Sequence, residues 1–205
     1  SIVIVNRVAP AKGNNMKLLK LLLLPLCLFP LMASAHNFVV GQPPAPITIT
    51  DGGEMLLNDD GSFSYRPWKS AQFAGKIRIV QYIAGRTSAK KKNSFLIKAV
   101  KAAHFPDDRF QPTTMVNTDD AIPGSGFFVK GKLEKNKRRY AWSQFIVDNE
   151  GIGRLAWHLK EESSTILVLD KEGRVRWAKD GALTTDEVHQ VLAMVHDMLQ
   201  KESEG

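Results

Sequence analysis

Cysteine is almost absent from the chain. Cys27 is the only cysteine among 205 residues, and it lies in a short apolar run, Leu21 to Met32. We expect this run to be removed from the mature chain, which then carries no thiol. That absence excludes a disulfide, a thiolate nucleophile and a thiolate metal site. The fold must be held together by its hydrophobic core, and about 170 residues are ample for one.

A long membrane-spanning run is also lacking. The apolar run follows a basic start, Met16 to Lys20, and is too short to cross roughly 30 Å of hydrocarbon with a margin. Ala33-Ser34-Ala35 is typical of a signal-peptide cleavage site. We therefore predict a signal peptide over residues 16–35, an unstructured upstream leader over 1–15, and one secreted domain over 36–205. No stable membrane insertion is expected after cleavage.

A strong charge of one sign is lacking once processing is considered. The whole chain has 28 basic and 21 acidic residues, a net charge of +7. The predicted leader and signal peptide carry four basic residues and no acidic one, which leaves 24 basic against 21 acidic residues. This near balance removes the argument for a nucleic-acid partner.

The remaining chain alternates between strand and helix patterns, which is typical of an α/β fold. Residues 77–83 are rich in Ile and Val and predict a buried strand. Thr184 and Glu187 form a capping box that predicts the start of the last helix. We predict strands over residues 77–83, 110–117, 144–148, 165–169 and 174–178, and helices over 88–103, 127–139 and 184–201. Residues 152–159 are predicted to form a short helix or an irregular segment.

The N-terminal part of the predicted domain contains turn signals. Asp51-Gly52-Gly53 predicts a turn between a strand over 47–50 and a returning strand over 54–57. Residues 62–68 are aromatic and are expected to be irregular. Asn58 to Gly61 resembles a calcium loop in composition but lacks the acidic spacing of one, and His36 has no second histidine specified as a copper partner. We predict no metal site.

Several stretches resemble known families. Phe73-Ala-Gly-Lys76 with the following IRIVQYIA, and the run TILVLDKEGRVRW over 165–177, resemble the thioredoxin fold. More closely, residues 83–93, 116–126 and 161–183 resemble the YtfJ family, secreted periplasmic proteins without an assigned activity. The resemblance implies a thioredoxin-like α/β fold, with a central mixed sheet flanked by helices and an N-terminal β-hairpin extension, and a periplasmic location. It implies no reaction.

The chain departs from redox-active thioredoxins at two places. Their paired cysteines would fall in residues 86–90, which here include Thr87 and Lys90. Their cis-proline would fall near Ser164, where no proline stands. Because disulfide exchange needs a thiolate, we expect neither a thiol-disulfide oxidoreductase nor a cysteine peroxidase, and no cofactor.

The loop after residues 77–83 is the predicted binding region, because the carboxyl ends of parallel strands open on one rim of a sheet. The candidate ligand-binding residues are Arg86, Thr87, Ser88, Lys90, Asn117, Asp119, Asp120, Ser163 and Ser164. No catalytic residue is assigned.

The role of this rim stays open. It could be a structural network in which Asp119 or Asp120 neutralises Arg86. It could instead bind a small anion or an acidic ligand, because the predicted helix from residue 88 has Lys90 to Lys92 in its first turn, where cations oppose the dipole. The preferred function is a non-catalytic interaction module for an unidentified periplasmic protein. A hydrolase using Thr87 or Ser88 with Asp119 or Asp120 is less favoured, since no histidine is placed nearby.

Overall fold

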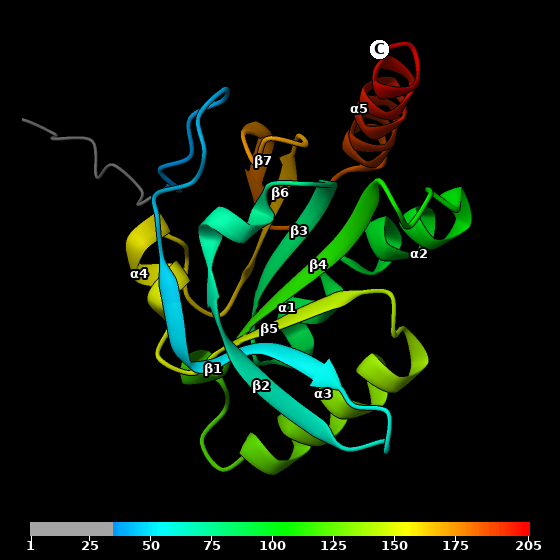
Figure 1. Ribbon diagram of the computed structural model, residues 1–205. Helices are drawn as coiled ribbons and strands as arrows, with labels where there is room; N and C mark the ends of the chain where they lie inside the picture. The colour runs from blue at the N-terminus through cyan, green and yellow to red at the C-terminus, as the bar shows by residue number, and fades with distance from the viewer. Residues whose placement is uncertain (1–34) are drawn as a thin grey trace, which may run out of the picture. The chain divides into compact units, whose positions relative to one another are not determined.

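The computed structural model describes residues 35–205, which form a seven-stranded mixed sheet with helices packed on it (Figure 1). The predicted leader and nearly all of the predicted signal peptide lie outside the described residues. The strands are β1 Thr48–Leu57, β2 Phe63–Lys69, β3 Ile77–Ala84, β4 Phe110–Asn117, β5 Gln144–Asp148, β6 Ser164–Leu169 and β7 Val175–Asp180. The helices are α1 Thr87–Lys91, α2 Ser94–Ala103, α3 Gly126–Arg139, α4 Ile152–Trp157 and α5 Thr185–Ser203, with 3-10 turns η2 Ser70–Phe73 and η3 Thr118–Asp120.

The sheet order is β2-β1-β5-β4-β3-β6-β7. β3 pairs in parallel with β4, and β4 in parallel with β5, so the three carboxyl ends lie at the same edge. β6, β7, β1 and β2 pair antiparallel. The predicted central mixed sheet is confirmed, as are the strand and helix order from residue 77 onward and the hairpin between β6 and β7.

The two faces of the sheet are covered by different elements. On one face, α2 and α5 pack apolar residues such as Leu96 and Val195 against Ile79 and Val168. The α5 helix starts with the predicted capping box, in which Glu187 N donates to Thr184 Oγ1. On the other face, Trp68, Phe73 and Trp157 of α4 join a buried cluster with Val80 and Met115. Burial of these large side chains is the main stabilising term of the fold.

The predicted turn at residues 51–53 is wrong. β1 runs through it as one strand, with a bulge at Gly52 and Gly53, whose φ angles are +95° and +94°. A Cβ on Gly52 would lie 2.3 Å from Val147 O, because β5 passes beside it. The hairpin turns instead at Asn58–Ser62, and β2 occupies residues that were expected to be irregular.

The predicted single helix over 88–103 is also wrong, because it breaks into α1 and α2 at Lys92 and Asn93. The Asn93 side chain is buried and turns toward the sheet, where Nδ2 donates to Ser164 Oγ (2.6 Å) and Gln81 Oε1 (2.9 Å). Lys90 and Lys91 therefore occupy the last turn of α1, where cations suit the helix dipole. The predicted conflict between these lysines and the dipole does not exist.

Over residues 35–205, no helix combines the length and the apolar character that a membrane span requires.

Candidate functional site

The loop between β3 and α1 is held tightly at the carboxyl edge of the sheet. Gly85 N donates to Asn117 O (2.9 Å), and a Cβ on Gly85 would lie 3.2 Å from the same oxygen. Ala84 N donates to Ser163 O (3.0 Å), so the loop before β6 is fastened to the other side of β3. The backbone therefore brings the predicted loops together at one rim.

Arg86 joins three loops at this rim. Its Nη2 atom lies 3.4 Å from Asp120 Oδ1 and 3.2 Å from Glu162 Oε1, and its Nε donates to Asp120 O (3.0 Å). Glu162 N donates to Asp120 Oδ2 (2.6 Å). The structural network weighed from the sequence is present, with Asp120 as the partner of Arg86. Glu162, which lies in the loop expected to approach this rim but is not among the candidate ligand-binding residues, is its second partner.

The predicted hydroxyl residues do not gather around these carboxylates. Thr87 and Ser88 are exposed on α1, and Thr87 Oγ1 accepts from Lys132 Nζ (3.2 Å). Ser163 and Ser164 are buried and accept from Lys92 Nζ (3.4 Å) and Asn93 Nδ2. Within the described residues, no hydrogen bond joins Thr87 or Ser88 to Asp119 or Asp120. The arrangement provides no activated hydroxyl.

Lys90 lies on the exposed side of α1 among other cations. Partial burial, followed by the charges of Lys132 and Lys101, lowers the pKa of the Lys90 ammonium. These three lysines therefore form a locally crowded positive region between α1, α2 and α3.

Asp148 is a buried carboxylate at the end of β5 that sequence reasoning missed. It accepts from the Tyr82 hydroxyl (2.6 Å), Ile152 N (2.9 Å) and Gly153 N (2.8 Å). It thereby holds the first turn of α4. Burial, reinforced by Asp148, raises the pKa of Tyr82, so this hydroxyl remains a donor. The following Asn149-Glu150-Gly151 had suggested only a turn.

Asn117 faces Asp148 across the β4–β5 pair and is 1% exposed. Its Nδ2 and Oδ1 atoms have no hydrogen-bond partner among residues 35–205. A Cβ on Gly151 would lie 3.3 Å from Nδ2 and 3.5 Å from Asp119 Oδ2, so this amide lies beside the Asp119 carboxylate. Because buried polar groups are almost always paired in folded proteins, an unpaired amide at this position costs stability.

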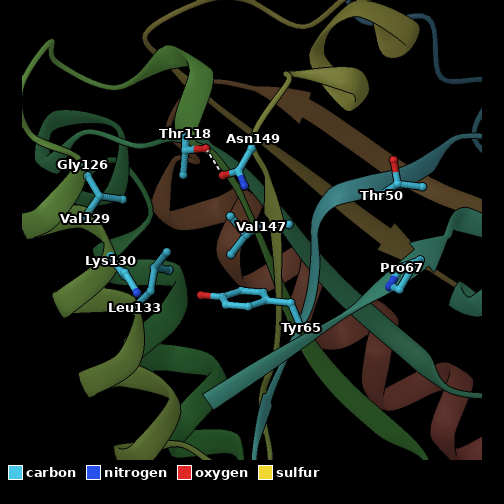
Figure 2. Close-up of a pocket in the computed structure, with 11 residues that line it drawn as sticks. Thr50, Tyr65, Pro67, Thr118, Gly126, Val129, Lys130, Leu133, Val147 and Asn149 are labelled. Atoms are coloured by element: carbon cyan, nitrogen blue, oxygen red, sulfur yellow. Dashed lines mark hydrogen bonds between the residues drawn. The ribbon is translucent and has the colours of Figure 1, made fainter. Parts of the chain in front are cut away.

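A pocket of about 590 Å³ lies between α3 and the β1–β2 hairpin (Figure 2). Figure 2 shows the Tyr65 ring pointing toward Leu133 and Lys130 of α3, with Val147 beside it. At one end, Thr118 Oγ1 donates to Asn149 Oδ1 (2.5 Å). The pocket is lined by Thr50, Gly52, Tyr65, Pro67, Thr118, Gly126, Val129, Lys130, Leu133, Val147 and Asn149.

The pocket adjoins the predicted rim, because Thr118 stands between Asn117 and Asp119 in the chain. Sequence reasoning missed it because its residues come from distant segments, including β2. Burial raises the pKa of the Tyr65 hydroxyl, and the charge of Glu134 adds to this effect. The pocket thus combines apolar walls, the ammonium of Lys130, and a neutral polar end formed by Thr118 and Asn149.

The fold places the protein in the thioredoxin-like class. Its structure is similar to a protein named as a disulfide isomerase from Bacteroides thetaiotaomicron, with a TM-score of 0.55 and 15% identity over 82% of this chain and 95% of that one. It is also similar to the thioredoxin domain of a thiol-disulfide oxidoreductase from Bacteroides vulgatus, with a TM-score of 0.50 and 16% identity over 77% and 97% of the two chains. At these identities the likeness shows the fold alone.

The sequence comparisons define the family. Residues 38–198 match the family model described as "Bacterial protein of unknown function (YtfJ_HI0045)". The chain is 60% identical to the uncharacterized protein YtfJ of Escherichia coli strain K12, over 91% of this chain and 98% of that one. It is 38% identical to an uncharacterized protein of Haemophilus influenzae, over 80% and 89%. The chain belongs to the YtfJ family.

The site lacks the chemistry of redox-active members of this fold class. No cysteine follows Cys27 in the sequence, and no cis peptide bond occurs in residues 35–205. The segment that approaches from β6 presents Glu162, Ser163 and Ser164 instead of a proline. The protein is therefore thioredoxin-like in fold and without a dithiol for disulfide exchange.

Proposed function

We propose that this protein is a non-catalytic binding module of the bacterial cell envelope. The observation that carries the proposal is the pocket beside α3. Its polar end adjoins the rim of the sheet at which Arg86 connects three loops through ion pairs and a hydrogen bond. The signal peptide predicted over residues 16–35 supports export to the periplasm. The partner proposed is a periplasmic protein.

Rigidity of the rim favours binding. Arg86 connects the loops after β3, after β4 and before β6, and Asp148 fixes the start of α4. A site whose loops are already ordered pays little conformational entropy on association. In these contacts the charged groups of Arg86 and Asp148 are already paired with other groups of the protein, whereas a catalyst would need charged groups that can act on a substrate.

The pocket favours an apolar side chain presented by an extended segment. Val129, Leu133 and Val147 supply apolar walls, while Thr118 and Asn149 supply polar groups at one end. Apolar walls with a few polar groups are typical of sites that bind a side chain and fix its orientation.

The small-anion alternative has less support. Arg86 already faces two carboxylates, Asp120 and Glu162, and the lysines of α1 do not occupy an unfavourable helix position. Titration with phosphate, followed by amide NMR shifts of residues 86–92, tests this alternative. Localised shifts at millimolar phosphate would favour anion binding over a protein partner.

The experiment for the binding module uses two glycines of α3. Gly126 lines the pocket and Gly131 does not, and a Cβ on either one meets no described atom within 4 Å. A photoreactive phenylalanine analogue at each position is expressed in the periplasm and illuminated. We expect a discrete adduct from position 126 that is absent from position 131.

A competition variant completes the test. Gly126→Leu narrows the pocket, whereas Gly131→Leu is a matched change on the same helix. Gly126→Leu should abolish an adduct formed from a photoreactive group at Tyr65, and Gly131→Leu should not. Identical adducts from all positions, or none, would contradict the proposal, and recovery in the cytoplasmic fraction would contradict the location.

A further inference from the structure

The first turn of α3 carries two unusually exposed aromatic side chains. Phe127 is 84% exposed and Phe128 is 70% exposed, with ring centroids 6.1 Å apart. Ile122, in the loop before the helix, is 55% exposed. Val129 and Leu133 of the same helix line the pocket, so the inner side of α3 is already occupied by the sheet and hairpin. Exposed apolar groups that cluster in this way are typical of a contact surface.

The surface around these aromatic side chains is basic. α3 carries six basic residues and only one acidic residue, Glu134. Lys132, Lys135 and Arg139 are exposed on it, and Lys90 of α1 lies close enough to both Lys132 and Lys101 to feel their charges. We call Ile122, Phe127, Phe128 and the exposed basic residues of α3 the α3 surface.

The charge of the domain is strongly segregated. Residues 86–142 contain 13 basic and five acidic residues, a net charge of +8. The rest of residues 36–205 contains 11 basic and 16 acidic residues, a net charge of −5. The predicted mature chain therefore has a small net charge but contains a positive region that includes α1, α2 and α3. This region can attract an anionic surface.

We infer that the α3 surface docks on an anionic phospholipid membrane, with Phe127 and Phe128 entering the interface and the basic side chains contacting lipid phosphates. This inference goes beyond the proposed function and uses the outer side of the helix. A helix with apolar side chains beside Lys and Arg binds membranes by apolar burial and by attraction to anionic lipid.

The geometry favours lipid over an acidic protein as the occupant. The two phenylalanines are highly exposed in the first turn of α3, and other residues of the helix, such as Val129 and Leu133, line the pocket. A protein partner would have to supply a matching hollow, whereas a fluid lipid interface accepts a protruding apolar group without one. The docking is peripheral and reversible.

The test measures flotation with vesicles of phosphatidylcholine, with and without phosphatidylglycerol. Protein from His36 onward is used, because all three buried clusters form within these residues. We expect binding only to vesicles that contain phosphatidylglycerol, and a decrease at high salt. Phe127→Ser with Phe128→Ser should weaken binding about tenfold or more. Leu155→Ser is the control, because Leu155 is an exposed apolar residue (59%) on α4, across the sheet.

Charge variants provide a second measurement. Lys132→Glu with Lys135→Glu should weaken binding about tenfold or more, while Lys171→Glu with Arg174→Glu, in the β6–β7 turn, should not. Equal binding to both kinds of vesicle, or no effect of the phenylalanine pair, overturns the inference. Binding of a soluble poly-glutamate peptide through the α3 surface, without vesicle binding, also overturns it and assigns the surface to an acidic protein.

Discussion

Each end of the parallel strands buries a polar side chain, but the two side chains differ greatly in the hydrogen bonds that they form. At the amino end, Arg78 is 5% exposed, and its guanidinium donates to Phe73 O (2.8 Å) and Gln144 Oε1 (2.7 Å), among other acceptors. At the carboxyl end, Asn117 is 1% exposed and its amide has no partner in residues 35–205. The amino end therefore satisfies its buried guanidinium, whereas the carboxyl end leaves one buried amide unsatisfied.

The amino-end network continues across the sheet. Gln144 Nε2 donates to Glu54 Oε2 (2.8 Å), and Glu54 pairs with Arg66 of β2. Burial lowers the pKa of Arg78 to about 10, with Glu54 opposing the shift, so the guanidinium remains charged at neutral pH. This polar ladder fastens the β1–β2 hairpin to the parallel strands.

The largest expected effect is at Arg78. Arg78→Met should lower the free energy of unfolding by about 3 kcal/mol, because it leaves several buried acceptors without a donor. Urea denaturation measures this value. Arg86→Met is the matched control at the other end of β3 and should cost about 1 kcal/mol, since its ion pairs are partly exposed. Equal losses would remove the distinction between the two ends.

A smaller loss of stability is expected from a substitution at Asp148, the buried carboxylate at the carboxyl end whose oxygens accept hydrogen bonds. Asp148→Asn should cost about 2 kcal/mol, because it weakens charge-assisted bonds to Tyr82 and to the first turn of α4. Thermal unfolding is compared with Asp197→Asn on the exposed side of α5, which should change stability by less than about 0.5 kcal/mol. If Asp148→Asn left the stability unchanged, α4 would not depend on this carboxylate.

A substitution at Asn117 is expected to raise the stability of the fold instead of lowering it. Asn117→Val should raise the free energy of unfolding by about 1 kcal/mol, because it replaces an unpaired buried amide by an apolar side chain suited to a strand. Asn93→Val is the control, since Asn93 is equally buried but donates two hydrogen bonds, and it should destabilise the fold. A clear loss of stability in Asn117→Val would identify Asn117 as structural.

The smallest effect concerns the ion pair between Arg86 and Glu162. A double-mutant cycle with Arg86→Gln and Glu162→Gln should give a coupling of about 0.5 kcal/mol that falls with added salt, because the Glu162 side chain is 66% exposed. The cycle with Asp120→Asn should give a larger coupling, since Asp120 is 11% exposed. A coupling to Glu162 that resists salt would place Arg86 in a buried network like that of Arg78.

Prediction from the sequence succeeded where local signals agreed with the packing. The apolar run of β3, the capping box at Thr184 and Glu187, and the order of strands and helices from residue 77 are all confirmed. Arg86 and Asp120 could be placed together because they follow adjacent parallel strands. The loop that carries Glu162 was expected to approach the same rim, but its ion pair with Arg86 depends on side-chain packing that the sequence does not specify.

Prediction failed where distant segments decide the conformation. Gly52 and Gly53 are typical turn residues, yet they form a bulge because β1 is paired on both sides, by β2 and by β5. Asn93 interrupts a helical pattern because the sheet offers its amide two acceptors. The local sequence shows neither the second partner strand of β1 nor the two acceptors that the sheet offers to Asn93.

The sequence by itself determined that the chain has one thiol, that β3 is a buried strand, and that the loops after β3 and β4 open on one rim. These conclusions follow from composition, from hydrophobic pattern and from the geometry of parallel strands. Only the tertiary structure decided that Arg86 is neutralised by two carboxylates, that Asn117 is buried without a described partner, and that a pocket forms beside α3. The physical reason is that hydrogen-bond satisfaction and cavity shape depend on which distant side chains meet, and those meetings are fixed by packing of the whole domain.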